Sequence, residues 1–219
     1  MVSTNRQPES LATLLGGRTA AIDATMPPVA FGIGWFLADK SIAVGAGAAL
    51  AVSVLIGAWR LLRGAKPRAV LIGALAVCVS ALIALRTGDA EDFFLPRILT
   101  NLVSLLGWAI SIVVRWPFLG VIVGAVLGQK TRWRRDPALL RAYSRASWVW
   151  VGQYLFRLVV FIPLWLAGQT GALTVAQIVL TWPLVAACLA VSWWVLRRSL
   201  PADHPGLRLE KDRDESVQP

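Results

Sequence analysis

The sequence predicts an all-α polytopic membrane protein, a bundle of about six transmembrane helices with one short re-entrant or interfacial helix. Three observations favour this fold class: 57% of the 219 residues are apolar, only 16% are charged, and charge-free stretches recur along the chain. Soluble domains carry about 25% charged residues, whereas a bilayer-spanning helix needs about 20 consecutive apolar ones. The composition therefore excludes an ordinary soluble domain.

Seven apolar segments follow one another between polar ends. They cover residues 24–38, 41–59, 69–85, 98–114, 116–128, 146–167 and 172–196. The segment 116–128 begins Trp116-Pro117 and is too short to cross a bilayer, so we expect it to be re-entrant or interfacial. The other six are predicted spans, and together they predict a single transmembrane domain over residues 22–196.

Basic residues determine the expected topology. The loop 60–68 carries a net charge of +4, and the segment 129–145 carries six basic residues and one aspartate, a net +5. Loops of this kind remain cytoplasmic. Because the short segment does not cross, both loops and both tails, 1–21 and 197–219, are predicted on the cytoplasmic side, and we expect the C-terminal tail to be disordered.

Tryptophans support this placement of the membrane boundaries. Five of the eleven lie close to predicted span ends, where amphipathic aromatic rings form a belt at the headgroup level. They are Trp59, Trp116, Trp133, Trp193 and Trp194.

Several chemistries lack the residues that they need. Cys78 and Cys188 each lie alone in an apolar stretch, and His204 lies in the polar tail, so we expect no metal site and no cofactor. Hydrolase, kinase and dehydrogenase motifs are absent from the sequence. The net charge of +10 is concentrated in the two basic loops, so we expect no nucleic-acid partner.

Polar residues within spans are the candidates for a functional site, because a charge in the bilayer is costly and normally faces the bundle interior. One helix face of the segment 146–167 carries Trp150, Gln153, Tyr154 and Arg157 at positions i, i+3, i+4 and i+7. A second stripe follows the segment 98–114 at steps of four and three. Its members are Arg97, Asn101, Ser104, Trp108, Ser111 and Arg115.

Arg157 lies near the middle of its span and needs an acceptor inside the bundle. We expect Asp92 as its first partner and Asp23 as its second. The alternative is that Arg157 meets backbone carbonyls, Gln153 or water. Helix capping for Asp23, and structural ion pairing for Asp92 and Glu91, are the alternatives to a role in a site.

Four strings of the sequence resemble an actinobacterial family of membrane proteins known as domain of unknown function 3159. They are DATMPPVAFGIGW, ALIALRTGDAEDFFLPRILTN, VRWPFLGVIVGAVLG and WRRDPALLRAYSRASWVW. The resemblance covers about residues 14–198. It implies an uncharacterised multi-pass protein of the bacterial plasma membrane.

A fainter similarity is to the intracellular septation protein A family of inner-membrane proteins. It rests on a proline-containing first span, an acidic and aromatic approach to a later span, and a basic residue before a short piece that ends Leu-Gly. Here these features lie at residues 23–35, 92–96, 115–118, 127–128 and at Trp133 and Trp148. The similarity implies an envelope or division function.

Three functions remain open, and the sequence does not decide whether the protein is an enzyme. The first is a non-enzymatic envelope or division-associated factor whose segments 60–68 and 129–145 bind anionic lipid. The second is a membrane-embedded enzyme acting on an amphiphilic small molecule such as an isoprenoid, with Asp23 and Asp92 as the acids, as in a terpene cyclase. The third is a transporter of small solutes or protons. The residues expected to bind a substrate are Glu91, Arg97, Asn101, Trp108, Trp150, Gln153, Tyr154 and Arg157.

Overall fold

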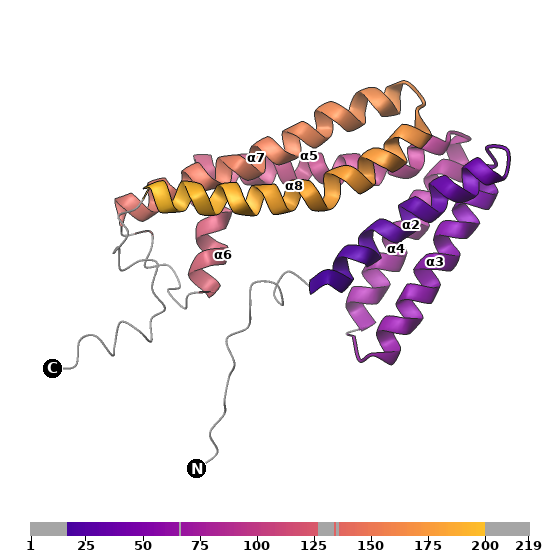
Figure 1. Ribbon diagram of the computed structural model, residues 1–219, viewed down its shortest axis with the longest axis horizontal. Helices are drawn as coiled ribbons and strands as arrows, with labels where there is room; N and C mark the ends of the chain where they lie inside the picture. Colours follow the sequence, from indigo (N-terminus) through magenta and orange to yellow (C-terminus); the bar gives the residue numbers. More distant parts are fainter. Residues whose placement is uncertain (1–16, 66, 127–133, 135, 200–219) are drawn as a thin grey trace, which may run out of the picture. The chain divides into compact units, whose positions relative to one another are not determined.

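The computed structural model describes residues 17–65, 67–126, 134 and 136–199. Within these residues the chain forms seven α-helices and one 3-10 helix and no strand, so the predicted all-α class is confirmed (Figure 1). The elements are α2 (Gly17–Leu37), α3 (Ile42–Leu62), α4 (Pro67–Thr87), η1 (Ala90–Phe94), α5 (Leu95–Val113), α6 (Phe118–Val126), α7 (Pro137–Leu166) and α8 (Thr170–Ser199).

Five helical segments of the described chain are long and apolar enough to cross a membrane. They are Ile42–Leu62, Pro67–Thr87, Ala90–Val113, Pro137–Leu166 and Thr170–Ser199. The apolar part of α2 is shorter, Thr25–Leu37, and at 1.5 Å per residue it reaches about 20 Å. The sixth span therefore rests on α2 and stays a prediction.

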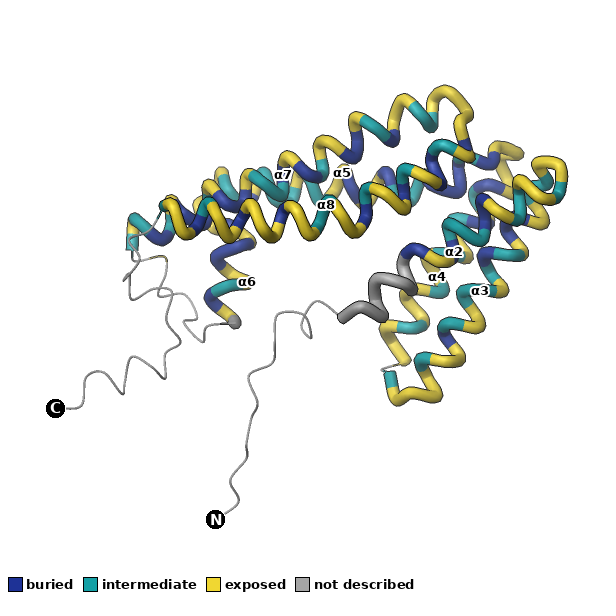
Figure 2. Tube along the Cα trace, viewed as in Figure 1, coloured by how far each residue is buried: buried dark blue, intermediate teal, exposed yellow. Residues whose placement is uncertain are grey.

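The outer surfaces of these helices are apolar. On α4, for example, Leu71, Ile72 and Leu75 are exposed, and Figure 2 shows exposed positions along both α3 and α4. Such a surface is unfavourable in water, whereas lipid tails accommodate it and leave backbone hydrogen bonding to the helix itself. The chain is therefore a membrane-embedded helical protein.

The chain divides into two compact units. Unit 1 is formed by the described residues of Met1–Ile98 and Val160–Trp182, and unit 2 by those of Leu99–Val159 and Pro183–Pro219. Helices α5, α7 and α8 contribute residues to both. Residues 1–16 and 200–219 lie outside the described residues, so the predicted tails and domain bounds stay predictions, although α8 itself continues to Ser199.

Unit 1 is packed through small residues. Helix α2 packs against α3, α3 packs against α4, and η1 contacts both α2 and α4. Where α2 meets α3, a Cβ atom built on Gly45 would lie 3.0 Å from the carbonyl oxygen of Phe31 and 3.1 Å from the Cβ of Trp35. Glycine thus allows the two backbones to approach closely, as is common between helices in lipid.

Helix α3 ends in a glycine cap at the start of the basic loop. The Gly64 N–H donates to the carbonyl of Leu61 and the Ala65 N–H to that of Arg60, and Gly64 has a φ of 78°. This pattern is a Schellman motif, which needs a left-handed residue after the helix. The basic residues of the loop 60–68 therefore begin on the last turn of α3.

Helix α7 begins nine residues earlier than predicted, so the segment 137–145 is helical and not part of a loop. The Asp136 Oδ1 accepts hydrogen bonds from the backbone N–H groups of Ala138 (2.8 Å) and Leu139 (3.3 Å), and Pro137 occupies the first helical position. Both features favour a helix start. The charges of Arg141 and Arg145 led to the prediction of a loop, although the opposite face of this helix is apolar.

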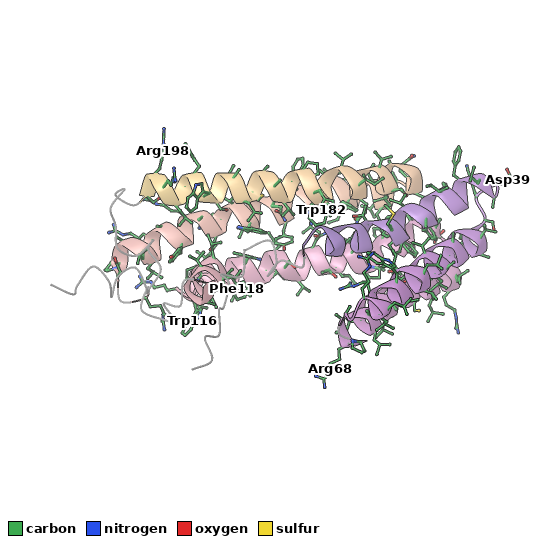
Figure 3. All side chains as sticks on the ribbon, turned by 60° about the horizontal axis from the view of Figure 1, so that its bottom comes forward. Asp39, Arg68, Trp116, Phe118, Trp182 and Arg198 are labelled. Atoms are coloured by element: carbon green, nitrogen blue, oxygen red, sulfur yellow. The ribbon has the colours of Figure 1, made fainter. Side chains whose placement is uncertain are left out.

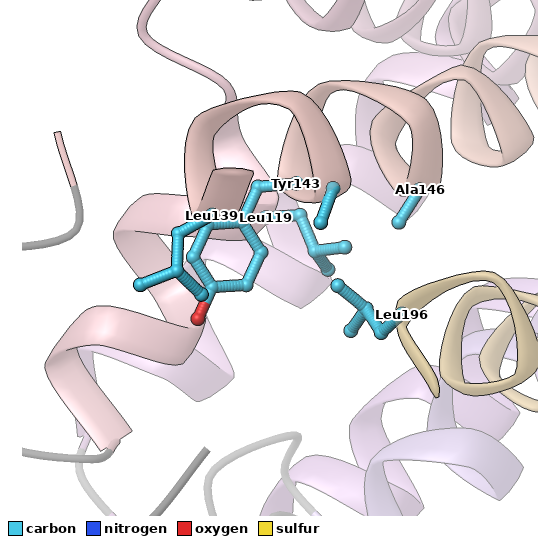
Figure 4. Packing of buried hydrophobic residues seen from close by; sticks show 6 residues of the cluster. Leu119, Leu139, Tyr143, Ala146 and Leu196 are labelled. Carbon is cyan, nitrogen blue, oxygen red and sulfur yellow. The ribbon is translucent and has the colours of Figure 1, made fainter. Parts of the chain in front are cut away.

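That face forms the hydrophobic core of unit 2. Side chains from α6, α7 and α8 meet there, as Figure 4 shows. The cluster consists of Leu119, Leu139, Ala142, Tyr143, Ala146 and Leu196. Through this cluster the start of α7 packs against the end of α8 and against the short α6.

Helix α6 forms within the segment 116–128, of which residues 127 and 128 lie outside the described residues. A tight turn separates it from α5: the Trp116 N–H donates to the Ser111 carbonyl at 2.8 Å, and Arg115 takes a left-handed φ of 57°. Over its described length α6 rises only about 13 Å, which is less than half of a bilayer core.

Substituting Gly45 by alanine tests the α2–α3 contact. We expect Gly45→Ala to lower the free energy of unfolding by about 1–2 kcal/mol, because overpacking exceeds the gain in helix propensity. Gly47→Ala is the matched control, since a Cβ there meets nothing within 4 Å. Thermal unfolding in detergent measures both; equal melting temperatures for the two variants would contradict this packing.

Candidate functional site

Two groups of polar side chains lie inside the protein. The acidic cluster of unit 1 consists of Glu91, Asp92, Trp165 and Thr170. The polar core of unit 2 consists of Asn101, Ser147, Trp150, Gln153, Arg157 and Ser192. We describe each group within its own unit.

The short helix η1 presents the acidic residues, and aromatic packing fixes its position. The ring of Phe93 stacks on that of Phe31 from α2, with centroids 4.0 Å apart. Phe94 contacts both rings edge-on. Because Phe93 and Phe94 follow directly after Glu91 and Asp92, these contacts hold the two carboxylates in place.

Both carboxylates bind side chains near the turn between α7 and α8. The Trp165 Nε1–H donates to Asp92 Oδ1 at 2.7 Å, and the Thr170 hydroxyl donates to Glu91 Oε2 at 3.4 Å. Asp92 is buried and Thr170 is almost fully buried. The acidic cluster therefore joins two segments that are far apart in the sequence.

Gly168 shapes the turn that makes this possible. It has a φ of 64°, and the Gln169 N–H donates to the Leu164 carbonyl at 2.9 Å, which closes α7 with a Schellman motif. A Cβ on Gly168 would lie 3.4 Å from Glu91 Oε1. Glycine is thus favoured by the backbone conformation, whereas a Cβ there would make only an ordinary van der Waals contact with Glu91.

A polar face on α8, which the sequence analysis missed, completes the interior of unit 1. The Thr174 hydroxyl donates to the Thr170 carbonyl at 3.0 Å, and a side chain on Gly32 of α2 would collide with Thr174. Four polar residues of this face are buried at steps of four, three and four: Thr170, Thr174, Gln177 and Thr181. The same spacing identified the stripe on α5, so it was available in the sequence.

The polar core of unit 2 is built by α5, α7 and α8. Five of its side chains are more than nine-tenths buried, with exposed fractions that leave little contact with lipid. The values are Asn101 2%, Ser147 0%, Gln153 4%, Arg157 5% and Ser192 4%. Ser147 and Ser192 were not among the predicted site residues.

Stacked tryptophans join α5 to α7. The rings of Trp108 and Trp150 are 5.2 Å apart and within 7° of parallel, and Phe118 of α6 packs edge-on against Trp108. Both tryptophans were predicted to line a site, and the structure brings them into direct contact. Their role in binding a substrate stays a prediction.

The stacked pair also sets the register of α5 and α7. The two helices run antiparallel, because α6, which follows α5, packs through Leu119 against the start of α7. Asn101 precedes Trp108 by two turns and Arg157 follows Trp150 by two turns, a rise of about 10 Å in each case. Asn101 and Arg157 therefore lie at the same level.

Helix α8 packs along the start of α7. Leu196, near the end of α8, belongs to the same hydrophobic cluster as Leu139 and Tyr143, so α7 and α8 are also antiparallel in unit 2.

Several polar atoms of the core are buried without a hydrogen bond to another part of the protein. They are Asn101 Nδ2, Ser147 Oγ, Trp150 Nε1, Gln153 Oε1 and Ser192 Oγ. Most buried polar atoms in proteins have a partner, and leaving one without costs about 1–3 kcal/mol. The five atoms belong to side chains of α5, α7 and α8.

The predicted site residues are divided between the two units. Glu91, Asp92 and Arg97 belong to unit 1, whereas Asn101, Trp108, Trp150, Gln153, Tyr154 and Arg157 belong to unit 2. Asp92 is engaged by Trp165, and the side chain of Asp23 lies outside the described residues. The pairing of Arg157 with either aspartate therefore stays a prediction.

Metal ligands do not gather in the part of the chain that the structure describes: no three His, Cys, Asp or Glu side chains there form a group able to hold an ion. Cys78 is exposed and Cys188 is buried, and neither forms a disulfide.

Comparison with known proteins identifies a family that the chain matches. A family model described as "Protein of unknown function (DUF3159)" matches residues 15–203, which confirms the resemblance seen in the sequence. No curated protein matches the chain. No solved structure matches it either. The actinobacterial origin and the similarity to septation protein A stay predictions.

Removing the Asp92 carboxylate tests the acidic cluster. We expect Asp92→Ala to lower the free energy of unfolding by about 1–3 kcal/mol, because the Trp165 N–H loses its acceptor. Asp89→Ala is the matched control, since Asp89 is exposed and makes no side-chain cap of η1. Thermal unfolding in detergent measures both, and an Asp92 variant as stable as the control would refute the assigned role.

Proposed function

We propose that this chain, which belongs to the DUF3159 family of proteins of unknown function, is a non-enzymatic protein of the bacterial plasma membrane whose unit 2 binds anionic lipid. The binding surface is one end of unit 2, where arginines and tryptophans are paired. We call it the basic aromatic end, and we assign it to the cytoplasmic leaflet.

The observation that carries this proposal is a set of cation–π pairs. In unit 2 the guanidinium carbons lie 4.1–4.9 Å from the centroids of indole rings. The pairs are Arg134–Trp116, Arg197–Trp193 and Arg198–Trp194. A fourth pair, Arg63–Trp59, follows α3 in unit 1 at 4.5 Å.

The three pairs of unit 2 gather at the same end of its helices. Trp116 precedes α6, Arg134 precedes α7, and Arg197 and Arg198 close α8; Figure 3 marks Trp116 and Arg198. The hydrophobic cluster of α6, α7 and α8 joins these helix ends. The pairs therefore lie at one end of unit 2.

This surface is strongly basic. The described residues at this end carry six arginines: Arg115, Arg134, Arg141, Arg145, Arg197 and Arg198. The carboxylate of Asp136 is occupied by the first turn of α7, where it accepts two backbone hydrogen bonds. The described residues of this end therefore carry a net positive charge.

Membrane physics favours anionic lipid as that partner. Indole rings prefer the headgroup level, and an arginine held over a ring there can extend its charge to a lipid phosphate. Each basic residue near an anionic leaflet contributes about 1 kcal/mol. Bacterial proteins keep such segments on the cytoplasmic side, which agrees with the topology predicted from the loops.

Neutralising the paired arginines tests this proposal. We expect Arg134→Gln, Arg197→Gln and Arg198→Gln together to weaken binding of phosphatidylglycerol by about 3 kcal/mol, roughly 100-fold, at low salt. The difference between the wild-type and triple-variant proteins should shrink as salt rises, because salt screens exposed charges. Titration of fluorescent phosphatidylglycerol into protein in a neutral detergent measures the affinity.

The control carries Lys40→Gln and Arg86→Gln, which remove two exposed charges on the opposite side of the predicted topology. It should bind phosphatidylglycerol as the wild type does. Equal affinities of the triple variant and the wild type at low salt, or an equal loss in the control, would overturn the proposal.

A further inference from the structure

Helix α6 has two different long sides, and one of them packs on the hydrophobic cluster of unit 2. On this side Leu119, Gly120 and Gly124 are buried, and Leu119 belongs to the cluster itself. The opposite side is exposed and wholly apolar. It consists of Phe118, Val121, Ile122 and Ala125, at positions i, i+3, i+4 and i+7 of one helix face. We call these four residues the outer row of α6.

Packing against α5 shows which way the outer row faces. The ring of Phe118 packs edge-on against that of Trp108, with centroids 5.5 Å apart, and a Cβ on Gly107 would lie 3.6 Å from Phe118. Trp108 precedes Arg115, which belongs to the basic aromatic end, by seven residues or about 10 Å. The outer row therefore begins on the hydrocarbon side of that end.

The course of α6 suits the membrane interface. Figure 1 shows α6 turning away from the direction of α5, which it follows in the chain. A helix at the interface buries its apolar face roughly 5–10 Å into the boundary between headgroups and acyl chains. At this depth the outer row meets the first part of the acyl chains of neighbouring lipids.

Basic and aromatic groups lie directly beside the start of the outer row. Trp116 precedes Phe118 by two residues, and its ring centroid lies 4.1 Å from the guanidinium carbon of Arg134. Arg115, which is exposed, precedes Trp116. A phosphate that binds these arginines would have its own acyl chains close to the outer row. Positive charge and apolar surface thus follow one another as phosphate and acyl chains do in a phospholipid.

We infer that the outer row of α6 binds the acyl chains of the anionic phospholipid whose phosphate lies at the basic aromatic end. The inference rests on the proposed function and extends it, because it makes the ligand a diacyl phospholipid and not a free phosphate diester. Such a lipid stays at α6 in preference to the zwitterionic lipid around it.

Photo-crosslinking tests the inference. The full chain is placed in phosphatidylcholine vesicles that contain a small fraction of a probe lipid, either phosphatidylglycerol or phosphatidylcholine, with a diazirine in the first part of an acyl chain. Mass spectrometry then identifies the labelled residues. We expect the phosphatidylglycerol probe to label the outer row about fivefold more than the phosphatidylcholine probe, which is the preference that one basic residue near an anionic leaflet supplies.

A row of α8 is the matched control. Val175, Ile178 and Val179 are exposed at positions i, i+3 and i+4, and no residue of α8 before Arg197 is charged. The two probes should label this row equally. Equal labelling of the outer row as well would overturn the inference. Absence of lipid labelling on the outer row, as when a second copy of the chain covers it, would also overturn it.

The arginine variant tests whether headgroup and acyl chains belong to one bound lipid. In the protein with Arg134→Gln, Arg197→Gln and Arg198→Gln, labelling of the outer row by phosphatidylglycerol should fall to the level of phosphatidylcholine. Preference retained in this variant would contradict the inference. Melting curves in detergent establish that the variant is folded; should it not fold, Arg134→Gln alone decides.

A soluble headgroup separates the two sources of phosphate. Glycerophosphoglycerol has the phosphodiester of phosphatidylglycerol but no acyl chains, so it should leave the labelling unchanged. Competition equal to that by unlabelled phosphatidylglycerol would overturn the inference and assign the site to a free phosphate diester. Loss of phosphatidylglycerol affinity in the triple variant, together with equal labelling of the outer row in the wild type, would refute this inference alone. Unchanged affinity in the triple variant would refute the proposed function itself.

Discussion

Polar side chains within a membrane-embedded helix must find their partners inside the protein, because lipid offers none. This constraint sets the rotation of the three helices that build unit 2. Asn101 on α5, Gln153 and Arg157 on α7 and Ser192 on α8 are all turned inward, and each leaves apolar residues on the outer face of its helix. The contacts between the helices depend on this rotation. It turns Trp108 of α5 toward Trp150 of α7, and it turns the hydrophobic cluster of α6, α7 and α8 inward.

The two units meet the same constraint with different residues. In unit 1 the buried polar groups are short or already engaged: Thr174 bonds its own helix, and Asp92 accepts from Trp165. The side chain of Thr174 packs against Gly32, and the backbone of Phe31 lies close to Gly45, so little space is left between the helices. In unit 2 several buried polar atoms have no hydrogen bond within the protein, among them Asn101 Nδ2, Trp150 Nε1 and Ser192 Oγ. The buried polar groups of unit 1 are therefore more completely satisfied than those of unit 2.

Sequence periodicity predicted the helices and the stripe on α5, because one turned-in face repeats every three or four residues. Periodicity failed where one face of a helix is charged and the opposite face is buried. Helix α7 begins at Pro137, but its start was predicted at Ala146. The polar face on α8 was missed because three of its four residues are threonines, which differ little from the apolar residues around them. The contact of Asp92 with Trp165 depends on a turn geometry and on distant packing, neither of which periodicity records.

The depth of the polar core follows from helix length. Helices α7 and α8 each contain 30 residues, about 45 Å, so they exceed the 30 Å of a hydrocarbon core and extend into at least one headgroup region. Arg145 belongs to the basic aromatic end, and Arg157 follows it by twelve residues on α7, about 18 Å. Arg157 therefore lies close to the middle of the bilayer when that end is at the headgroups. The charge that the lipid tolerates least is thus buried inside the protein.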